Sequence, residues 1–254
     1  DRLAGRREFT LITLDDDKRK DPAAKREALN DADFVILCLP DDAAKEAVAM
    51  TTSNHTRIID ASTAHRVDPH WAYGFPEYRE RQHDRIANAR LVSNPGCYPT
   101  GFLGLVAPLV AAGLIPEDWP YTINAVSGYS GGGKALIERF ESDAGADIGF
   151  RTYGLDLSHK HVPEMQTHAG LGLAPIFSPA VVRAFRGMMV EVPLPISVMP
   201  GSDSPEEMRN ALAAHYAGSP VVTVHQQLAP SELLILNTQE PSDRLDLYVL
   251  GSPD

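Results

Sequence analysis

The sequence predicts an α/β protein, with a Rossmann-like, doubly wound parallel sheet followed by an α+β domain that has a mixed sheet. One observation is the apolar run at 34–39, which does not alternate and is typical of a parallel strand buried on both faces. Another is the strand, helix, strand order that follows it. A third is that few helices separate the later strands. We expect the first of these domains at 1–96 and the second at 97–254.

Composition narrows the class of protein. The chain has 254 residues, 43% of them apolar, and a net charge of −11, as in an acidic globular protein. The acidic balance argues against nucleic acid as a partner, and no apolar run reaches the roughly 18 residues of a membrane-spanning helix. Two cysteines are too few for a disulfide scaffold, so we expect a reducing, cytoplasmic setting.

The first elements are short. Residues 1–5 have the pattern of a helix end, with Gly5 as its C-cap. The stretch 9–14 is apolar and β-prone and is predicted to form a strand. The charged stretch 15–31 is predicted to be a solvated helix and loop.

The run at 34–39 is the first strand of the predicted βαβ pattern. Cys38 lies inside it and is expected to pack within the sheet. Pro40 ends the run, and the acidic residues that follow cap the next helix. Ligands of such sheets bind outside the carboxyl ends of the strands, where Pro40 and the segments 60–66 and 94–97 are expected. The remaining elements of the first domain are a helix at 43–50 and strands at 57–60 and 91–93.

The second domain is predicted to begin with an apolar helix. Ser204 opens a capping box with a proline at the first helical position, so a later helix begins there and ends near Gly218. The other predicted elements are the helix at 100–113 and strands at 121–127, 187–192, 221–224, 233–236 and 245–250.

Cys97 is the strongest candidate for a reactive group. The segment 93–101 reads Ser-Asn-Pro-Gly-Cys-Tyr-Pro-Thr-Gly, which places a thiol after a tight turn, at or near the start of a helix. Backbone amides and the helix dipole there favour a thiolate and lower its pKa below the roughly 8.5 of an ordinary thiol. The same amides can bind an oxyanion on an attacked carbonyl. The alternative is a buried structural cysteine.

A thiolate nucleophile needs a group that transfers protons. The segment 158–164 supplies His159, His161 and Glu164 within a few residues. Acid–base chemistry or substrate binding is one interpretation, and a solvated loop is another. His-x-His is also a metal-ligand spacing, but no further ligand cluster accompanies it, so we predict no metal. The remaining single histidines are expected to have surface or packing roles, and they are His65, His168, His215 and His225.

The segment 127–134 is rich in glycine, follows a predicted strand and ends in Lys134. Glycines let backbone amides approach a phosphate closely, so this segment is a candidate for phosphate or cofactor binding, against the alternative of a flexible loop. It is not a Walker A loop, because Ala135 occupies the Ser/Thr position. Arg66 follows another strand and is either a bidentate clamp for a carboxylate or phosphate or a surface arginine.

Taken together, these motifs resemble the N-acetyl-γ-glutamyl-phosphate reductase family of arginine biosynthesis, in its shorter bacterial class. The most specific pieces are Asn-Pro-Gly-Cys-Tyr-Pro-Thr at 94–100 and His-Lys-His-Val-Pro-Glu at 159–164. The other matching stretches, which occur in the family's order, are 36–43, 59–66, 71–77 and 124–134.

The resemblance implies a mechanism. Cys97 would displace phosphate from the acyl phosphate to give a thioester, and NADPH would reduce the thioester to N-acetylglutamate semialdehyde. His159 or His161 would be the acid–base group, and we favour His161. The resemblance also implies substrate contacts from Arg66, Ser62, Asn94 and Glu164, and cofactor contacts from Leu39, Pro40, Ser62, Ser127, Gly128 and Gly131. The resemblance further implies a dinucleotide-binding domain at 1–96, a catalytic and dimerisation domain at 97–254, and a homodimer or homotetramer.

The sequence differs from the family pattern at its ends. The expected first strand and Gly-rich dinucleotide loop are not in this sequence, nor is a closing helical segment after 245–250. Residues 15–17 are acidic, as in NAD-binding folds, whereas residues 18–20 are basic and suit the 2′-phosphate of NADP, which the family prefers.

Three other functions compete with this interpretation. One is a thiol-dependent semialdehyde dehydrogenase of the aspartyl-phosphate type, which shares the chemistry. Another is a cysteine hydrolase, which leaves the dinucleotide domain unexplained. The last is a non-catalytic fragment that only binds.

Overall fold

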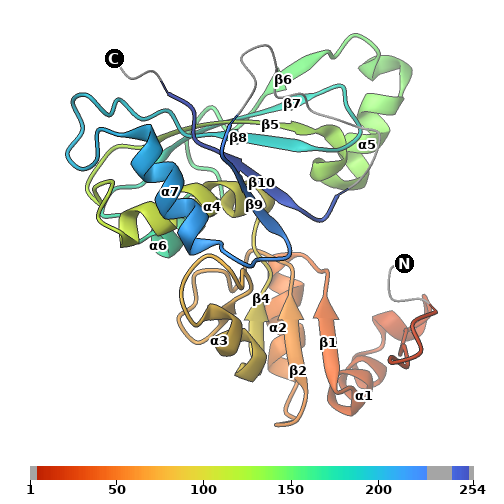
Figure 1. The fold of residues 1–254 in the computed structure, drawn as a ribbon. Coiled ribbons are helices and arrows are strands. Elements are labelled where there is room, and N and C mark those ends of the chain that lie inside the picture. Colours follow the sequence, from red (N-terminus) through yellow and green to blue (C-terminus); the bar gives the residue numbers. More distant parts are fainter. Residues whose placement is uncertain (1–4, 228–241, 252–254) are drawn as a thin grey trace. The chain divides into compact units, whose positions relative to one another are not determined.

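The computed structural model describes residues 5–227 and 242–251, and the chain forms two units (Figure 1). One unit comprises residues 5–74 and 83–95, and the other comprises residues 75–82 with the described residues from 96 onward. Residues 1–4 of the predicted helix end at 1–5 and the predicted strand at 233–236 lie outside the described residues. None of the described helices is long and apolar enough to cross a membrane.

The first unit is built on a 4-stranded parallel sheet with the order β1-β2-β4-β3. The parallel sheet predicted for the first third of the chain is therefore confirmed. Strands β2 and β4 have the predicted bounds, and helix α2 begins two residues earlier than expected. The elements are η1 (Lys18–Lys20), α1 (Pro22–Asp31), β1 (Phe34–Leu37), α2 (Asp41–Met50), β2 (Arg57–Asp60), β3 (Ala72–Tyr73), α3 (Gln82–Asn88) and β4 (Leu91–Ser93).

The core of this unit lies on one face of β1. Val35 and Leu37 are buried in a cluster with residues of α2 and β2, whereas Phe34 and Ile36 are 54% and 52% exposed. The expectation that this strand is buried on both faces is therefore wrong. Successive side chains of a strand point to opposite faces of the sheet, so the apolar residues of β1 divide between the face that the cluster covers and the face that is exposed in the described part of the chain.

Two further expectations for this unit are corrected. Residues 9–14 form no strand, and Phe9, Leu11 and Ile12 are exposed. A β-prone stretch needs a ladder partner, and the described part of the sheet provides none beside it. Cys38 is exposed rather than packed, because β1 ends at Leu37 and the thiol falls just outside the ladder.

The second unit contains a 4-stranded mixed sheet with the order β6-β7-β5-β8 (Figure 1). Strand β5 is parallel to β7 and antiparallel to β8, which confirms the predicted mixed pairing. Strands β9 and β10 form a separate parallel pair. The elements are α4 (Cys97–Ala111), β5 (Thr122–Gly128), η2 (Tyr129–Gly132), α5 (Gly133–Glu141), η3 (Asp143–Gly145), β6 (Phe150–Thr152), α6 (Val162–Ala169), β7 (Ile176–Val182), β8 (Met188–Glu191), α7 (Pro205–His215), β9 (Val222–His225) and β10 (Leu245–Tyr248).

Helix α4 is the centre of the second unit. It packs against α6, α7, β8 and β10, and most of its side chains are buried. Its glycines permit this close packing, because a Cβ at Gly101 would lie 2.8 Å from Val190 Cγ2 and one at Gly104 would lie 2.9 Å from Leu245 Cδ2. The first residue of α4 is thus held by a rigid, well-packed element.

Candidate active site

Cys97 is the first residue of helix α4, and its side chain is exposed. Gly96 is the N-cap, with φ −67° and ψ 149°, and its carbonyl accepts hydrogen bonds from the backbone nitrogen and the hydroxyl of Thr100 at 3.0 and 2.9 Å. The predicted position of the thiol at a helix N-terminus is therefore confirmed. Unpaired backbone amides and the positive end of the helix dipole stabilise negative charge at such a position.

The two histidines of the motif lie at the start of helix α6. His161 is the N-cap of α6 and is 6% exposed, and its ring meets the ring of Tyr98 edge-on, with centroids 6.0 Å apart. His159 is half-buried, and its Nδ1 accepts a hydrogen bond from the backbone nitrogen of His161 at 3.1 Å. Because Tyr98 follows Cys97 directly in α4, the imidazole of His161 is the one that contacts the helix of the thiol.

The environment of His159 disfavours its charged form. Burial lowers the pKa of His159, the positive charge of Lys160 lowers it further, and the negative charge of Asp156 opposes both effects. A neutral imidazole keeps one nitrogen as an acceptor, which agrees with the bond that Nδ1 accepts from the backbone of His161.

Two tyrosine hydroxyls, those of Tyr98 and Tyr153, lie near the thiol, and the sequence did not single them out. Tyr98 donates to Ser127 Oγ at 2.8 Å, and Tyr153 donates to the hydroxyl of Tyr98 at 3.3 Å. Burial raises the pKa values of both tyrosines, and the negative charge of a Cys97 thiolate raises them further. The two hydroxyls therefore stay protonated and remain donors near the thiol. Tyr98 lies within a recognised motif, whereas no pattern around Tyr153 marks it.

Glu164 connects helix α6 to the start of α4. Its carboxylate accepts a hydrogen bond from the backbone nitrogen of Gly96 at 2.6 Å, and the residue is 1% exposed. The side chain that the resemblance assigned to the substrate is thus buried against the protein's own backbone in this structure.

The glycine-rich segment at 127–134 packs closely on the segment that follows β7. The amides of Gly128, Tyr129 and Ser130 donate to the carbonyls of Gly187, Ala184 and Phe185 at 2.9 to 3.0 Å. These three amides are consequently engaged with backbone rather than directed at a phosphate site. Gly131 and the following residues through Lys134 are exposed. Ser127 is buried and is bonded to Tyr98.

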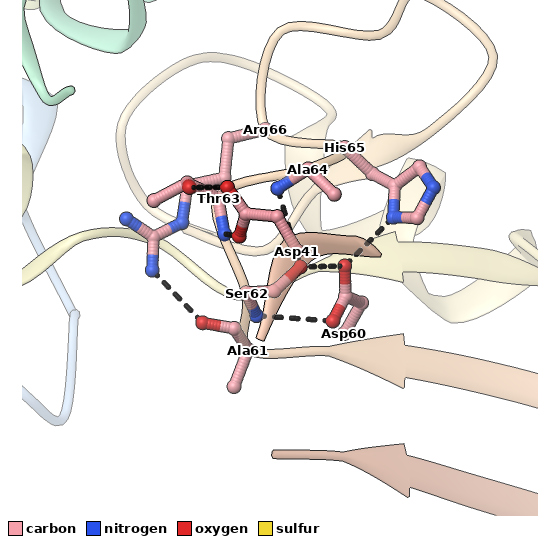
Figure 2. A network of polar contacts seen from close by, with 8 residues as sticks. All are labelled: Asp41, Asp60, Ala61, Ser62, Thr63, Ala64, His65 and Arg66. Carbon is pink, nitrogen blue, oxygen red and sulfur yellow. Dashed lines mark hydrogen bonds and ion pairs between the residues drawn. The ribbon is translucent and has the colours of Figure 1, made fainter. Parts of the chain in front are cut away.

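In the first unit, a hydrogen-bonded loop follows strand β2 (Figure 2). Asp60 is fully buried and accepts bonds from the backbone nitrogen of Ser62 at 3.0 Å, from the Ser62 hydroxyl at 2.7 Å and from His65 Nδ1 at 2.7 Å. The His65 ring stacks on Trp71 at 4.1 Å. His65 thus has a packing role, as expected, but it belongs to a network that the sequence did not reveal.

The rest of this loop is also held in place. The carboxylate of Asp41, at the start of α2, accepts bonds from the backbone nitrogen and the hydroxyl of Thr63 (Figure 2). Arg66 donates to the carbonyl of Ala61 at 3.0 Å and is 8% exposed, so the alternative of a surface arginine is wrong. Ser62 and Arg66 are therefore held in place, largely buried, within a hydrogen-bonded loop at the carboxyl end of a parallel strand.

The other predicted site residues of the first unit lie at the same kind of position. Leu39 and Pro40 follow β1 and are exposed, and Asn94 follows β4, is exposed and donates its backbone N–H to the carbonyl of Asp60 at 2.7 Å. Within residues 5–227 and 242–251, no group of three or more histidine, cysteine or acidic side chains is arranged to hold a metal ion.

Comparisons with known proteins agree with these two units. Residues 9–86 match the family described as semialdehyde dehydrogenase, NAD binding domain, and residues 97–242 match the family described as semialdehyde dehydrogenase, dimerisation domain. Aspartate semialdehyde dehydrogenase from Francisella tularensis has a similar fold, with a TM-score of 0.56 at 12% identity over 78% of this chain and 66% of that chain. The fold and site together define a protein of the semialdehyde dehydrogenase class.

Relatives in sequence are more specific. N-acetyl-γ-glutamyl-phosphate reductase from Rhizobium etli is 48% identical over 99% of this chain and 83% of its own length. N-acetyl-γ-glutamyl-phosphate reductase 2 from Pseudomonas putida is 49% identical over 91% of this chain and 75% of its own length. The chain belongs to the N-acetyl-γ-glutamyl-phosphate reductase family, which confirms the resemblance seen in its motifs.

Proposed function

We propose that this chain carries out the NADP-dependent reductive dephosphorylation of N-acetyl-γ-glutamyl phosphate, in arginine biosynthesis. The observation that carries the proposal is the exposed thiol of Cys97 at the first position of helix α4, in a second unit that also holds a buried imidazole against the same helix. A thiol in this position is an activated nucleophile, and an acyl phosphate is a substrate that such a nucleophile attacks.

In the first half of the reaction, the sulfur of Cys97 attacks the carbonyl carbon of the acyl phosphate. The bond from that carbon to the phosphate oxygen breaks, phosphate leaves with the bonding electrons, and a thioester to Cys97 forms. Backbone amides at the start of α4 stabilise the oxyanion that develops on the carbonyl oxygen. The hydroxyls of Tyr98 and Tyr153 stay protonated and neutral, so they add no negative charge that would repel the thiolate.

In the second half, bound NADPH supplies the hydride that reduces the thioester. His161 holds the proton that exchanges with the oxygen of the resulting thiohemiacetal on Cys97, and collapse of this adduct breaks the carbon–sulfur bond. The semialdehyde leaves, and the thiolate is restored. We assign the acid–base role to His161, because its ring contacts the helix of the thiol, and a positioning role to His159, whose Nδ1 accepts the backbone N–H of His161.

The anionic groups of the substrate meet donors of the preformed loop in the first unit. Arg66 is the clamp for a carboxylate or phosphate, with Ser62 and Asn94 as further substrate contacts. Residues 1–96 bind the dinucleotide, and residues 97–254 carry catalysis and subunit association.

The residues present fit NADP along the carboxyl edge of the parallel sheet. Leu39 and Pro40 are exposed there and suit packing against a ring of the dinucleotide, and Ser62 lies on the next loop. In the second unit, the segment that begins at Ser127 and Gly128 is the one that the resemblance places beside the cofactor, and Gly131 is one of its exposed glycines. Basic residues at 18–20 suit the 2′-phosphate of NADP.

The oligomeric state and the cellular location of the protein are proposed from its surface and its charge. On the mixed sheet of the second unit, Phe150 and Ile176 are 60% and 44% exposed on one face, which suits a homodimer or homotetramer built through that face. We place the protein in the cytoplasm, with a small anionic substrate and neither nucleic acid nor membrane as a partner, in accord with a net charge of −11.

The test is the reverse reaction, read as NADPH formed from N-acetylglutamate semialdehyde, NADP and inorganic phosphate. Cys97→Ser should abolish it, and Cys38→Ser should leave it unchanged, since both thiols are exposed but only one begins a helix. Formation of NADPH without added phosphate would indicate a hydrolytic or phosphate-independent enzyme. Turnover of aspartate semialdehyde in preference to the acetylated substrate would indicate the aspartyl-phosphate type, and full turnover by Cys97→Ser would contradict the mechanism.

A further inference from the structure

We propose that Glu164 is a positioning residue that fixes the backbone from which Cys97 projects, and that it is not a ligand of the substrate. The proposal deepens the proposed function, because it concerns the same nucleophile. The carboxylate of Glu164 accepts the backbone N–H of Gly96 at 2.6 Å, and the side chain is 1% exposed. A carboxylate so buried, and bonded to the protein's own backbone, has little surface left for a substrate.

The bond reaches the residue that sets the direction of the thiol. Gly96 is the N-cap of α4, and Cys97 is the first helical residue. The carbonyl of Gly96 accepts from Thr100, and its N–H donates to Glu164, so the peptide groups on both sides of the N-cap are fixed. Hydrogen bonds to a carboxylate are shorter and stronger than neutral ones, which suits a bond that must hold a turn in place.

The acceptor of this bond, Glu164, lies in the same helix end as the imidazole of His161. Glu164 lies in the first turn of α6, and His161 is the N-cap of that helix. An acidic side chain is favourable at this end of the helix dipole. Helices α4 and α6 also pack together, so a single carboxylate connects the N-terminus that carries the thiol to the N-terminus that carries the acid–base group.

Other titratable groups act on the thiol in this unit. The hydroxyls of Tyr98, on α4, and Tyr153, after β6, interact with a Cys97 thiolate, and His161 and His159 lie at the start of α6. The test therefore compares substitutions of Glu164 that leave all four groups intact.

The experiment measures the rate at which iodoacetamide alkylates Cys97 as a function of pH. The background carries Cys38→Ser, which leaves Cys97 as the sole thiol. Glu164→Ala removes the acceptor, and Glu164→Gln keeps an oxygen acceptor for the Gly96 amide. Glu206→Ala is the matched control, because Glu206 is an exposed glutamate in the first turn of α7, another helix with a proline in its first turn.

Both substitutions of Glu164 remove a carboxylate, which by itself favours the thiolate, but only Glu164→Ala also removes the acceptor for the Gly96 amide. We therefore expect the alkylation midpoint of Glu164→Ala to lie about one pH unit above that of Glu164→Gln, which is about a tenfold lower rate at neutral pH, because a loosened N-cap stabilises the thiolate less. Glu164→Gln should lie at or below the midpoint of the background, and Glu206→Ala should stay within a few tenths of a unit of it. In turnover, Glu164→Ala should lower kcat more than it raises KM.

Three outcomes would overturn the proposal. The first is an equal alkylation midpoint in Glu164→Ala and Glu164→Gln together with a raised KM in both, which is the behaviour of a substrate ligand. The second is a lower melting temperature of Glu164→Ala with equal midpoints in the two variants, which is a purely structural role. The third, decisive if Glu164→Ala does not fold, is a Glu164→Gln profile shifted upward by about a unit. Alkylation needs no substrate, so the alkylation profiles stand apart from whether the proposed reaction is correct.

Discussion

Gly128 and Gly131 both belong to the glycine-rich segment, but the structure gives them opposite tolerances for a side chain. A Cβ added at Gly128 would lie 2.6 Å from the carbonyl oxygen of Ala184 and 2.6 Å from the nitrogen of Arg186. Backbone atoms cannot swing aside as a flexible side chain does. A Cβ at Gly131 would have its nearest neighbour, Ser127 Oγ, at 4.0 Å.

The magnitude of the Gly128→Ala effect follows from these contacts. The φ of −66° at Gly128 suits any residue, so the cost is steric rather than conformational. Overpacking costs about 1–3 kcal/mol, and displacement of the segment that begins at Ala184 weakens amide–carbonyl bonds worth about 1 kcal/mol each. We therefore expect a loss of about 3 kcal/mol in the free energy of unfolding, or roughly 6–12 °C in Tm for a chain of this size.

Gly131→Ala provides the comparison. Gly131 is not among the described residues with positive φ, and the space around its Cβ is open, so its stability should stay equal or rise by up to about 0.5–1 kcal/mol. The assay is urea unfolding followed by circular dichroism, with NADPH binding measured on the same samples by fluorescence. Equal stability losses in the two variants, or a stable Gly128→Ala protein, would refute the reasoning from these contacts.

Further predictions concern single side chains. Tyr98→Phe keeps the ring but removes the hydroxyl that bonds to Ser127, so the free energy of unfolding measured in urea should fall by about 1–2 kcal/mol, and an unchanged midpoint would argue against this bond. Lys160→Met should raise the pKa of His159 as measured by NMR titration, because the positive charge of Lys160 lowers it, and a lowered or unchanged pKa would count against that cause. Since the folded state holds the pKa of His159 below the unfolded value of 6.5, its contribution to stability is fully present above about pH 6.5 and declines as the pH falls below that value toward the folded pKa. Ser204→Ala should cost about 1 kcal/mol in the same urea assay, because the Ser204 hydroxyl accepts the first-turn backbone N–H of α7 at 3.2 Å, and full stability would mean that this cap contributes nothing.

The sequence predicted the elements whose ends have a local cause. The turn at 94–96 placed Cys97 at or near a helix start, although the helix was expected only from 100 and α4 begins at Cys97 itself. Ser204 with the proline after it placed the start of α7. Strands β2 and β4 were predicted with their observed bounds, since each is a short segment with an apolar pair, Ile58 with Ile59 and Leu91 with Val92, next to polar residues.

Features that depend on a neighbour elsewhere in the fold were not predicted. Whether the apolar residues of β1 are covered depends on what lies over the sheet, so Phe34 and Cys38 were expected to be buried and are exposed. The site shows the same limit. Asp60 was visible only as a strand end, and its role in holding Ser62 and His65 requires the folded loop.

Tyr153 and Glu164 illustrate this limit in the second unit. Nothing adjacent to Tyr153 in the chain shows that its hydroxyl meets Tyr98, 55 positions away. Glu164 was recognised within its motif, but only the three-dimensional structure shows that its partner is the backbone of Gly96. Local patterns thus located the reactive residues, whereas the contacts that orient them are long-range.

The central claim is that Cys97 forms a covalent thioester with the substrate. It is tested most directly by intact-mass spectrometry after the protein is mixed with N-acetyl-γ-glutamyl phosphate in the absence of NADPH. We predict release of phosphate and an increase in mass equal to one N-acetylglutamyl group per chain, located on the peptide that contains Cys97 and discharged when NADPH is added. Cys97→Ser should show neither change, and the Cys38→Ser control should show both. An adduct on another residue, or undiminished turnover by Cys97→Ser, would contradict the account.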